Sequence, residues 1–199
     1  MFQLQKDQVP RAAEVLARAF FDDPVFEHFF PYGRTRLAQS RWTFRFLLNQ
    51  AVANGRAFCT SPLFEGVAAW IHSSKPKWGI IEEARRGGIP MLIHQQAGAI
   101  RRQMRESAYM KKVHLRMITV DHWYFSTIGI DPASRGRGHG DRLVRKMLEE
   151  VDGDRSACYL DTHKARNVAY YRRYGFEVVH RASPPESGVD HWAMVREPR

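Results

Sequence analysis

The apolar residues of this chain follow two patterns that alternate along the sequence. Short runs rich in aromatic and β-branched residues predict strands, and the clearest is HWYFSTIGI at residues 122–130, which the Asp131-Pro132 turn ends. Runs of this kind occur at residues 2–5, 56–60, 66–72, 122–130, 158–162, 177–180 and 190–195. The second and third are joined by the Ser61-Pro62 turn, which predicts a hairpin.

Elsewhere, apolar residues recur every three or four positions, the spacing of a helix with one buried face. Segments with this spacing lie at 7–20, 37–51, 75–115, 143–151 and 167–176. Asp7 suits the N-cap of the first helix, and residues 21–24 break it. The segment at 75–115 is interrupted at Gly87-Gly88 and Pro90. Strands and helices therefore mix along the chain, which predicts an α/β fold.

The loop at residues 134–140, with the sequence SRGRGHG, carries the strongest chemical signal. It separates the strand at 122–130 from the helix at 143–151. Its glycines let the backbone approach a bulky anion, and the free N–H groups of the following helix point at that anion. Arg135 and Arg137 add charge-assisted donors. The pattern indicates a phosphate-binding loop.

This loop and the segments after it resemble the GNAT superfamily of acyl-CoA-dependent N-acetyltransferases. The family's cofactor loop has the pattern Arg/Gln-x-x-Gly-x-Gly/Ala, which Arg135, Gly138 and Gly140 match. A second family signature, an Asn followed by an aromatic-Tyr pair and then Gly-Phe, is matched by Asn167, Tyr170, Tyr171, Gly175 and Phe176. The stretch AFFDDP at 19–24 is similar to the opening of the puromycin N-acetyltransferase branch of this superfamily.

The resemblance implies a mixed, mostly antiparallel central sheet of six to seven strands, flanked by helices and splayed between strands 4 and 5. It also implies a single domain over residues 1–199, with an extra helical segment at 75–118 between strands 3 and 4. In the puromycin-type branch, such helices form a wall or lid over the acceptor, and the loop after the first helix borders the acceptor pocket. Phe26, Phe29 and Phe30 follow that loop and are either core or pocket lining.

The cofactor implied by the resemblance is acetyl-CoA. Its pantetheine arm would pair with backbone groups of Ile128 and Ile130, and its pyrophosphate would sit on the N–H groups from Arg135 to Asp141. The Asp141 carboxylate departs from the pattern: turned outward it complements the helix dipole, and turned inward it weakens cofactor binding. The cofactor contacts assigned in this way are Ile128, Gly129, Ile130, Arg135, Gly136, Arg137, Gly138, His139, Gly140, Asp141, Asn167, Tyr170, Tyr171 and Arg173.

Tyr171 is the candidate proton donor to the departing thiolate, and thus the candidate catalytic residue. A phenol with a pKa of about 10 is protonated at neutral pH, and its transfer to a thiolate is uphill by only about 2 kcal/mol. The general base is left open among Asp121, His122, Asp161 and water. A lysine amine is neutral about 500-fold less often at pH 7 than an α-amine, so the lack of an evident base favours a small-molecule or α-amine acceptor.

Composition and charge add limits. The length of 199 residues and 44% hydrophobic content predict a globular chain. No leader or bilayer-spanning run is present, so we expect a soluble, cytoplasmic protein with no membrane partner.

The net charge of +10 is concentrated at residues 75–116, where there are ten basic and three acidic residues. This charge attracts anions such as coenzyme A, while nucleic-acid binding is disfavoured because no recognised module accompanies it. The histidines lack metal-ligand spacing, so no metal site is expected.

Three functions remain open at this stage. The first is transfer of an acetyl group to a primary amine of a metabolite or antibiotic-like small molecule, by direct attack in a ternary complex. The second is acetylation of a protein N-terminus or lysine, and the third is an acyl-CoA-binding module whose basic face contacts nucleic acid. A pocket closed by residues 75–118 favours the first, an open groove favours the second, and salt-dependent DNA retention favours the third. A homodimer is also left open.

Overall fold

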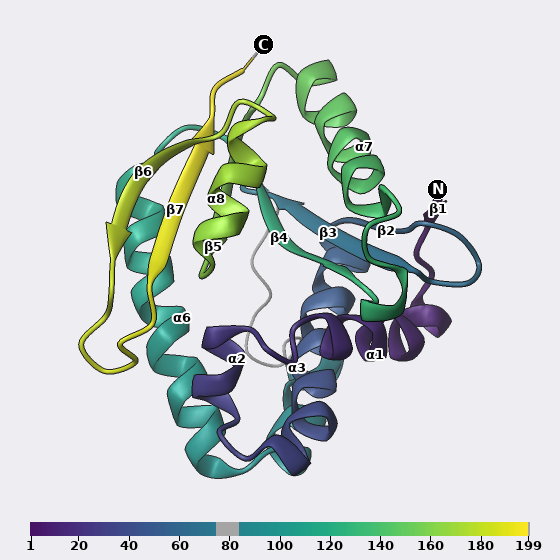
Figure 1. The fold of residues 1–199 in the computed structure, drawn as a ribbon, viewed down its shortest axis with the longest axis vertical. Helices are drawn as coiled ribbons and strands as arrows, with labels where there is room; N and C mark the ends of the chain where they lie inside the picture. Colours follow the sequence, from purple (N-terminus) through teal and green to yellow (C-terminus); the bar gives the residue numbers. More distant parts are fainter. Residues whose placement is uncertain (75–83, 199) are drawn as a thin grey trace.

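The computed structural model describes residues 1–74 and 84–198 and contains one seven-stranded sheet (Figure 1). The strands are β1 (Phe2–Gln3), β2 (Gly55–Cys59), β3 (Gly66–His72), β4 (His122–Ile130), β5 (Ala157–Thr162), β6 (Glu177–Ala182) and β7 (His191–Arg196). Their order is β1-β2-β3-β4-β5-β7-β6, with β4 and β5 parallel and every other neighbouring pair antiparallel. The predicted mixed, mostly antiparallel sheet is confirmed.

The helices agree with the predicted segments at most positions. They are α1 (Val9–Ala19), α2 (Pro24–Phe29), α3 (Gly33–Asn54), α5 (Ile89–His94), α6 (Ala97–Met117), α7 (His139–Gly153) and α8 (Ala165–Arg172), with short turns η1 (Lys6–Gln8), η2 (Ala84–Gly88) and η3 (Pro132–Ser134). The interruption predicted at Gly87-Gly88 and Pro90 is confirmed, since Gly87 has a non-helical φ of 134° and Pro90 lies in the first turn of α5. The predicted helix at 75–115 falls on η2, α5 and α6, except for residues 75–83, which lie outside the described residues.

Two details near the N-terminus were predicted wrongly. Asp7 does not cap the first helix, because it lies inside η1 and the N-cap of α1 is Gln8. The stretch read as a break also starts a new helix. There the Asp23 carboxylate accepts a hydrogen bond from the Val25 N–H at 3.2 Å, and Pro24 occupies the first turn of α2. An Asp-Pro pair both ends one helix and begins the next, because proline lacks the N–H that a first turn leaves free anyway.

Side chains alternate between the two faces of the sheet, as the strand pattern requires. On β3, Val67 and Ala69 pack into the hydrophobic core under α1 and α3, whereas Ala68 and Trp70 pack into the core under α7. Near the end of β4, the α carbon of Gly129 lies so close to α1 that a Cβ there would approach Leu16 and Ala19 within 2.8 Å. A glycine at this position therefore lets α1 lie directly on the strand.

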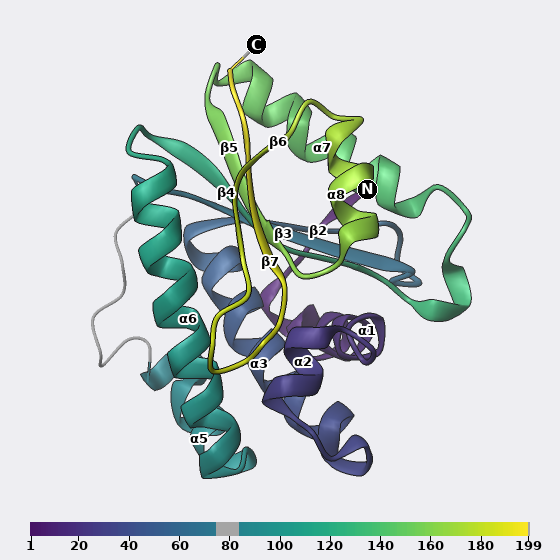
Figure 2. The same ribbon diagram turned by 60° about the vertical axis from the view of Figure 1, so that its left-hand side comes forward.

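The long helix α6 covers the half of the sheet face that α1 and α3 leave uncovered. It lies beside α3 in both views (Figures 1 and 2). A buried polar network joins the two helices. Gln103 accepts a hydrogen bond from the Thr43 hydroxyl at 2.7 Å and donates one to Gln95 at 2.8 Å, while Gln95 donates to the Gln39 carbonyl at 2.9 Å. Buried amides without partners cost free energy, so this satisfied network defines where α6 sits relative to α3.

The sheet splays between β4 and β5, as predicted. Their parallel pairing runs from His122 opposite Ala157 to Phe125 opposite Leu160 and then stops. Beyond Phe125, β4 continues to Ile130 while β5 turns toward β7. The backbone of residues 126–130 therefore faces open space, and not a neighbouring strand, on its β5 side.

Candidate active site

A cavity of about 530 Å³, here called the loop cavity, lies beside the glycine loop, between the splayed strands and the start of α8. It is lined by Ala19, Phe20, Asp23, Ile128, Gly129, Ile130, Ser134, Arg135, Gly136, Gly138, His139, Gly140, Asp141, Lys164, Arg166, Asn167, Tyr170 and Tyr171. Every residue assigned to the cofactor from the sequence lies in this wall except Arg137 and Arg173. The structure thus brings together the two sequence motifs that lie about thirty residues apart in the chain.

The loop has the backbone conformation that an anion cradle needs. Gly136 and Gly138 adopt φ angles of 78° and 74°, in the left-handed region that favours glycine, and Gly138 is the N-cap of α7. The first N–H groups of a fifteen-residue helix point out of this turn. With the open backbone of β4 beside it, the loop cavity fits a molecule with a phosphate end and an amide-bearing arm.

The charged side chains around the loop are partly engaged with the protein itself. Arg135 donates to the Ala19 carbonyl at 3.0 Å, which ties the loop to the end of α1. The Asp141 carboxylate accepts a hydrogen bond from the Tyr174 hydroxyl at 2.6 Å and lies 3.7 Å from the Arg173 guanidinium. The Tyr174 hydrogen bond is the main cause that lowers the pKa of Asp141. Asp141 is therefore ionised and held toward α8, while Arg173 stacks over the Tyr170 ring at 4.8 Å.

A second cavity of about 440 Å³, here called the aromatic cavity, lies on the other side of Tyr171. It is lined by Phe20, Asp23, Val25, Phe26, Phe29, Thr43, Phe44, Leu47, Gln50, Asn54, Ile71, His72, Ser73, Gln103, Ser107, Met110, His114, His122, Tyr124, Phe125, Ser126, Thr127, Ile128, Leu160, Asp161, Thr162, His163, Asn167 and Tyr171. The rings of Phe20, Phe26 and Phe44 pack together with centroids 4.8–5.3 Å apart. Phe26 and Phe29 are thus both core and cavity lining, whereas Phe30 is core alone.

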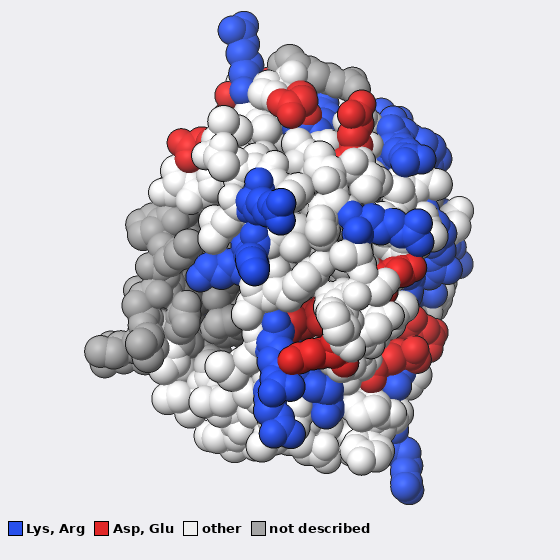
Figure 3. All heavy atoms as spheres, turned by 90° about the vertical axis from the view of Figure 1, so that its left-hand side faces the viewer, with Lys and Arg blue, Asp and Glu red and all other residues white. Residues whose placement is uncertain are grey.

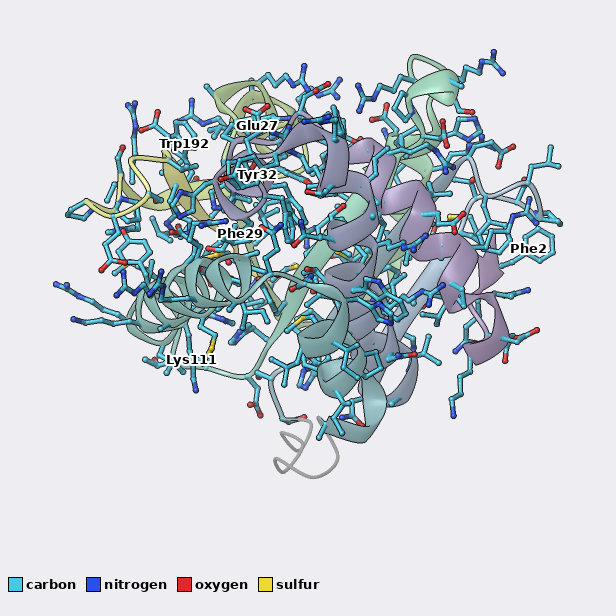
Figure 4. The ribbon with its side chains drawn as sticks, turned by 90° about the horizontal axis from the view of Figure 1, so that it is seen from below. Phe2, Glu27, Phe29, Tyr32, Lys111 and Trp192 are labelled. Carbon is cyan, nitrogen blue, oxygen red and sulfur yellow. The ribbon has the colours of Figure 1, made fainter. Side chains whose placement is uncertain are left out.

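Helix α6 contributes one face to this cavity, through Gln103, Ser107, Met110 and His114. These positions are spaced by three or four residues, so they lie along one side of the helix. Seen from below, Phe29 lies between α2 and α6, whereas Lys111 extends from the outer side of α6 (Figure 4). The sequence predicted a wall at residues 75–118. Within that segment, α6 borders the cavity, and residues 75–83 lie outside the described part of the chain.

The two cavities meet at five residues that line both: Phe20, Asp23, Ile128, Asn167 and Tyr171. The Tyr171 ring packs edge-on against Phe125 and Phe176, which fixes its orientation. Burial raises the pKa of the Tyr171 hydroxyl well above its ordinary value. The phenol is therefore protonated at any physiological pH, and proton transfer from it to a thiolate is more uphill than the ordinary phenol value suggests.

Asp23 is a carboxylate that our sequence analysis did not assign to the site. Its side chain is 7% exposed, caps α2 and lies 3.5 Å from the Lys164 ammonium group. Burial raises the pKa of Asp23 even though Lys164 opposes the shift. A carboxylate with a raised pKa at the junction of two cavities is a better proton acceptor than a solvated one. The signal for it was the Asp-Pro pair after an amphipathic helix.

The three base candidates from the sequence lie elsewhere. Asp121 is exposed and lines neither cavity. His122 lines the aromatic cavity, but it precedes Ile128 by six residues, or about 20 Å along an extended strand, so it lies far from the junction. The Asp161 carboxylate already accepts hydrogen bonds from Tyr159 and His191, both at 2.7 Å.

Two buried polar atoms in the wall of the aromatic cavity have no hydrogen-bond partner among the described residues. They are the Thr127 hydroxyl oxygen on β4 and the Nε2 atom of His163, just after β5. Burial lowers the pKa of His163 to about 4, so its imidazole is neutral at pH 7. Because buried polar groups are nearly always paired, these two atoms indicate that the cavity takes up a ligand or water.

The surface over α6, β6 and β7 carries basic groups interspersed with acidic ones (Figure 3). Arg105 on α6, for example, forms an ion pair with Glu186 at 3.3 Å. None of the helices in the described ranges combines the length and the apolar character needed to cross a membrane. Nor do residues 1–74 and 84–198 hold a group of three or more His, Cys, Asp or Glu side chains arranged for a metal ion.

Comparison with known proteins supports the assignment from the motifs. Residues 82–178 match the acetyltransferase (GNAT) domain family. The chain is 38% identical over 73 residues to the N-alpha-acetyltransferase RimI of Mycobacterium tuberculosis, a match that covers 36% of this chain and 46% of that protein. It is 40% identical over 75 residues to an uncharacterized protein of Mycobacterium leprae, covering 36% of this chain and 20% of that one. The chain therefore spans about half or less of the length of these curated relatives.

The whole fold also has solved counterparts. A crystal structure described as histone acetyltransferase HPA2 and related acetyltransferase, from Corynebacterium glutamicum, superposes with a TM-score of 0.68 at 21% identity, covering 100% of this chain and 95% of that one. At this identity the likeness concerns the fold alone. The assignment to the puromycin-type branch stays a prediction. The domain family that matches residues 82–178, the two sequence motifs and the splayed sheet together identify a GNAT acetyltransferase domain in this chain, and members of that superfamily take the acetyl group from acetyl-CoA.

Proposed function

We propose that this chain transfers the acetyl group of acetyl-CoA to a primary amine of a small molecule, by direct attack in a ternary complex. The observation that carries the proposal is the meeting of the two cavities at Tyr171, Asn167 and Ile128. The loop cavity fits the cofactor, and the aromatic cavity provides a separate space for an acceptor. Two substrates that occupy them together would have their reacting atoms at the junction.

The shape of the aromatic cavity supports a small acceptor. Side chains from α2 and α3 form one side of it, α6 another, and β4 and β5 the floor. A protein N-terminus needs an exit for the chain that follows it, whereas a small molecule needs only the space between these three sides. We propose that α6, as part of the extra segment at 75–118, acts as the acceptor-site wall.

The second candidate is acetylation of a protein N-terminus, and the similarity to RimI favours it. That relative is named an N-alpha-acetyltransferase, and its match reaches 36% of this chain. The two candidates share the cofactor site, the α-amine chemistry and the proton transfers. They differ only in how much of the acceptor extends beyond the aromatic cavity.

Bound acetyl-CoA supplies a thioester whose carbonyl carbon accepts the amine. The Asp23 carboxylate takes a proton from the acceptor ammonium, which leaves a neutral amine able to attack. As the C–N bond forms and the C–S bond breaks, Tyr171 gives its hydroxyl proton to sulfur and regains one from the new amide nitrogen. Asn167, whose side chain donates to Thr162 on β5 at 3.0 Å, holds α8 and therefore Tyr171 in place.

Thiol release measured with acetyl-CoA and a panel of small amines and N-terminal peptides tests this function. We expect small amines to support release, and the change Tyr171→Phe to lower kcat by about 10²-fold while coenzyme A binding is retained. Tyr109→Phe, which removes a hydroxyl outside both cavities, serves as the control. Wild-type turnover by Tyr171→Phe would remove the proposed acid. Release with peptides alone would replace the small-molecule acceptor with a protein N-terminus.

A further inference from the structure

Part of the wall of the aromatic cavity away from the junction is an apolar patch. Phe26, Phe44 and Leu47 from α2 and α3 face the cavity together with Met110 from α6 and Ile71 from β3. These side chains can bury a hydrocarbon or aromatic group but offer no hydrogen bond to a hydrated one. An acceptor with an apolar body therefore gains free energy by covering this patch, while one that is polar throughout leaves the patch without an apolar partner.

The charges in this wall have one sign. Two carboxylates line the aromatic cavity, Asp23 at the junction and Asp161 on β5, and no lysine or arginine lines it among the described residues. The Lys164 ammonium, which pairs with Asp23, belongs to the wall of the loop cavity. A cationic amine is thus attracted to the junction, whereas an acceptor that carries its own carboxylate meets two carboxylates in this wall and no lysine or arginine that lines it.

Two histidines in this wall, His122 and His163, are held toward their neutral forms. Burial is the main cause that lowers the pKa of both His122 and His163. His122 also lies within 2.6 Å of His114, nitrogen to nitrogen, and within 2.7 Å of the Val120 carbonyl oxygen. The Nδ1 atom therefore donates to Val120, and the close approach of the two Nε2 atoms leaves room for a single proton between them. Burial therefore favours the neutral forms of His122 and His163.

We propose that the acceptor is an amine with an apolar, aromatic-sized body and no carboxylate beside its amino group. The inference rests on the proposed function and adds the substrate class to it. It follows from the apolar patch, from the carboxylate at the junction and from the lack of a lysine or arginine in the described wall. An arylalkylamine has this chemistry, and a free amino acid with the same side chain does not.

Two matched pairs of amines test this inference through kcat/KM for thiol release. 2-Phenylethylamine and L-phenylalanine differ by one carboxylate, and 2-phenylethylamine and ethylamine differ by the aromatic ring. We expect 2-phenylethylamine to exceed each of the others by about tenfold or more, because a buried unpaired carboxylate and an unfilled apolar pocket both weaken the transition state. Equal or better turnover of L-phenylalanine or ethylamine would overturn the inference while the proposed function stands. An absence of thiol release with every amine and peptide would refute the function and the inference together.

A change on α6 separates the charge argument from simple fit. Met110 is half-buried in the cavity wall, whereas Met104 is 67% exposed on the same helix and lines neither cavity. Met110→Lys introduces the missing cation, and we expect it to reduce the preference for 2-phenylethylamine over L-phenylalanine by about tenfold. Met104→Lys makes the same substitution outside the cavity and should preserve the preference. An unchanged preference in a folded Met110→Lys protein, with coenzyme A binding intact, would contradict the charge argument.

Discussion

The loop cavity and the aromatic cavity differ in how the chain builds them. Most of the loop cavity comes from residues 128–141 and 164–171, and the groups that suit it to a cofactor are main-chain N–H groups and glycines. The aromatic cavity draws on α1, α2, α3, β3, α6, β4, β5 and α8, and what suits it to a ligand is side chains alone. Recognition through the backbone leaves a compact motif in the sequence, whereas recognition by assembled side chains leaves none.

The two cavities also differ in what holds their walls together. Around the loop, hydrogen bonds join the two motifs to each other, as from Tyr174 to Asp141, and join the loop to the end of α1, as from Arg135 to the Ala19 carbonyl. Around the aromatic cavity, the Gln39, Thr43, Gln95 and Gln103 network joins helices that lie about fifty residues apart in the chain. We therefore expect changes around the loop to affect cofactor binding and changes on α6 to affect the acceptor, with the junction affecting both.

Asp23→Asn tests the junction and has the largest expected effect. Asparagine still caps α2 but cannot accept the amine's proton, so we expect kcat/KM to fall by about 10²-fold with the acid limb of its pH profile lost. Because burial raises the pKa of Asp23, the ionised form costs stability at neutral pH, and this cost disappears as the pH falls through the folded-state pKa. The variant should therefore melt at a higher temperature at pH 7 and lose that advantage in acid. Asp22→Asn, at the exposed neighbour, should change neither quantity.

Gly138→Val tests the backbone character of the loop cavity. A β-branched residue at a φ of 74° is strained by about 1 to 3 kcal/mol, and relief of that strain would move the N–H groups of the first turn of α7. We expect coenzyme A to bind about tenfold or more weakly by calorimetry, while the ratio of kcat/KM values for two different amines stays the same. Gly153→Val makes the same substitution at the other end of α7, where the φ is ordinary and a Cβ meets no atom within 4 Å. Equal binding losses in the two variants would show that the loop conformation is not what matters.

Arg102→Gln tests whether α6 positions the acceptor wall. Its guanidinium donates two hydrogen bonds to the Phe29 carbonyl, at 2.7 and 3.2 Å, and so ties α6 to α2. We expect a loss of about 1 to 2 kcal/mol in the free energy of unfolding and a rise of about threefold in the acceptor KM, with coenzyme A binding unchanged. Arg101→Gln, at an exposed neighbour on the same helix, is the control. A weaker affinity for coenzyme A with an unchanged acceptor KM would show that α6 supports the cofactor site and not the acceptor site.

Asp141→Asn probes the acidic group at the start of α7 in the wall of the loop cavity and has the smallest expected effect. The amide can still accept the Tyr174 hydrogen bond, but it removes a negative charge beside the predicted pyrophosphate position. We expect coenzyme A to bind about two- to fivefold more tightly at low salt, with the gain shrinking as ionic strength rises. Glu149→Gln, an exposed change near the far end of α7, should not alter affinity. A weaker affinity in Asp141→Asn would show that the carboxylate supports the site by holding Tyr174 and Arg173.

Local patterns determined much of this protein. The alternation of apolar residues predicted the strands and all the long helices, and the motifs at 135–140 and 167–176 predicted the loop cavity with only Arg137 and Arg173 outside its wall. They succeed because glycines with positive φ, helix N-termini and strand periodicity are properties of neighbouring residues.

Tertiary structure alone decided the rest. The resemblance of residues 19–24 placed their loop beside the acceptor pocket, but no local pattern indicates that Asp23 lines the same junction as Tyr171 or that Met110 shares a cavity wall with Phe44. Asp121 and His122 were left as candidate bases, but Asp121 lines neither cavity and the length of β4 separates His122 from the junction. The physical reason is that the burial, the pKa and the cavity position of a side chain depend on contacts between residues far apart in the chain, which form only when helices α1, α2, α3 and α6 pack against the splayed sheet.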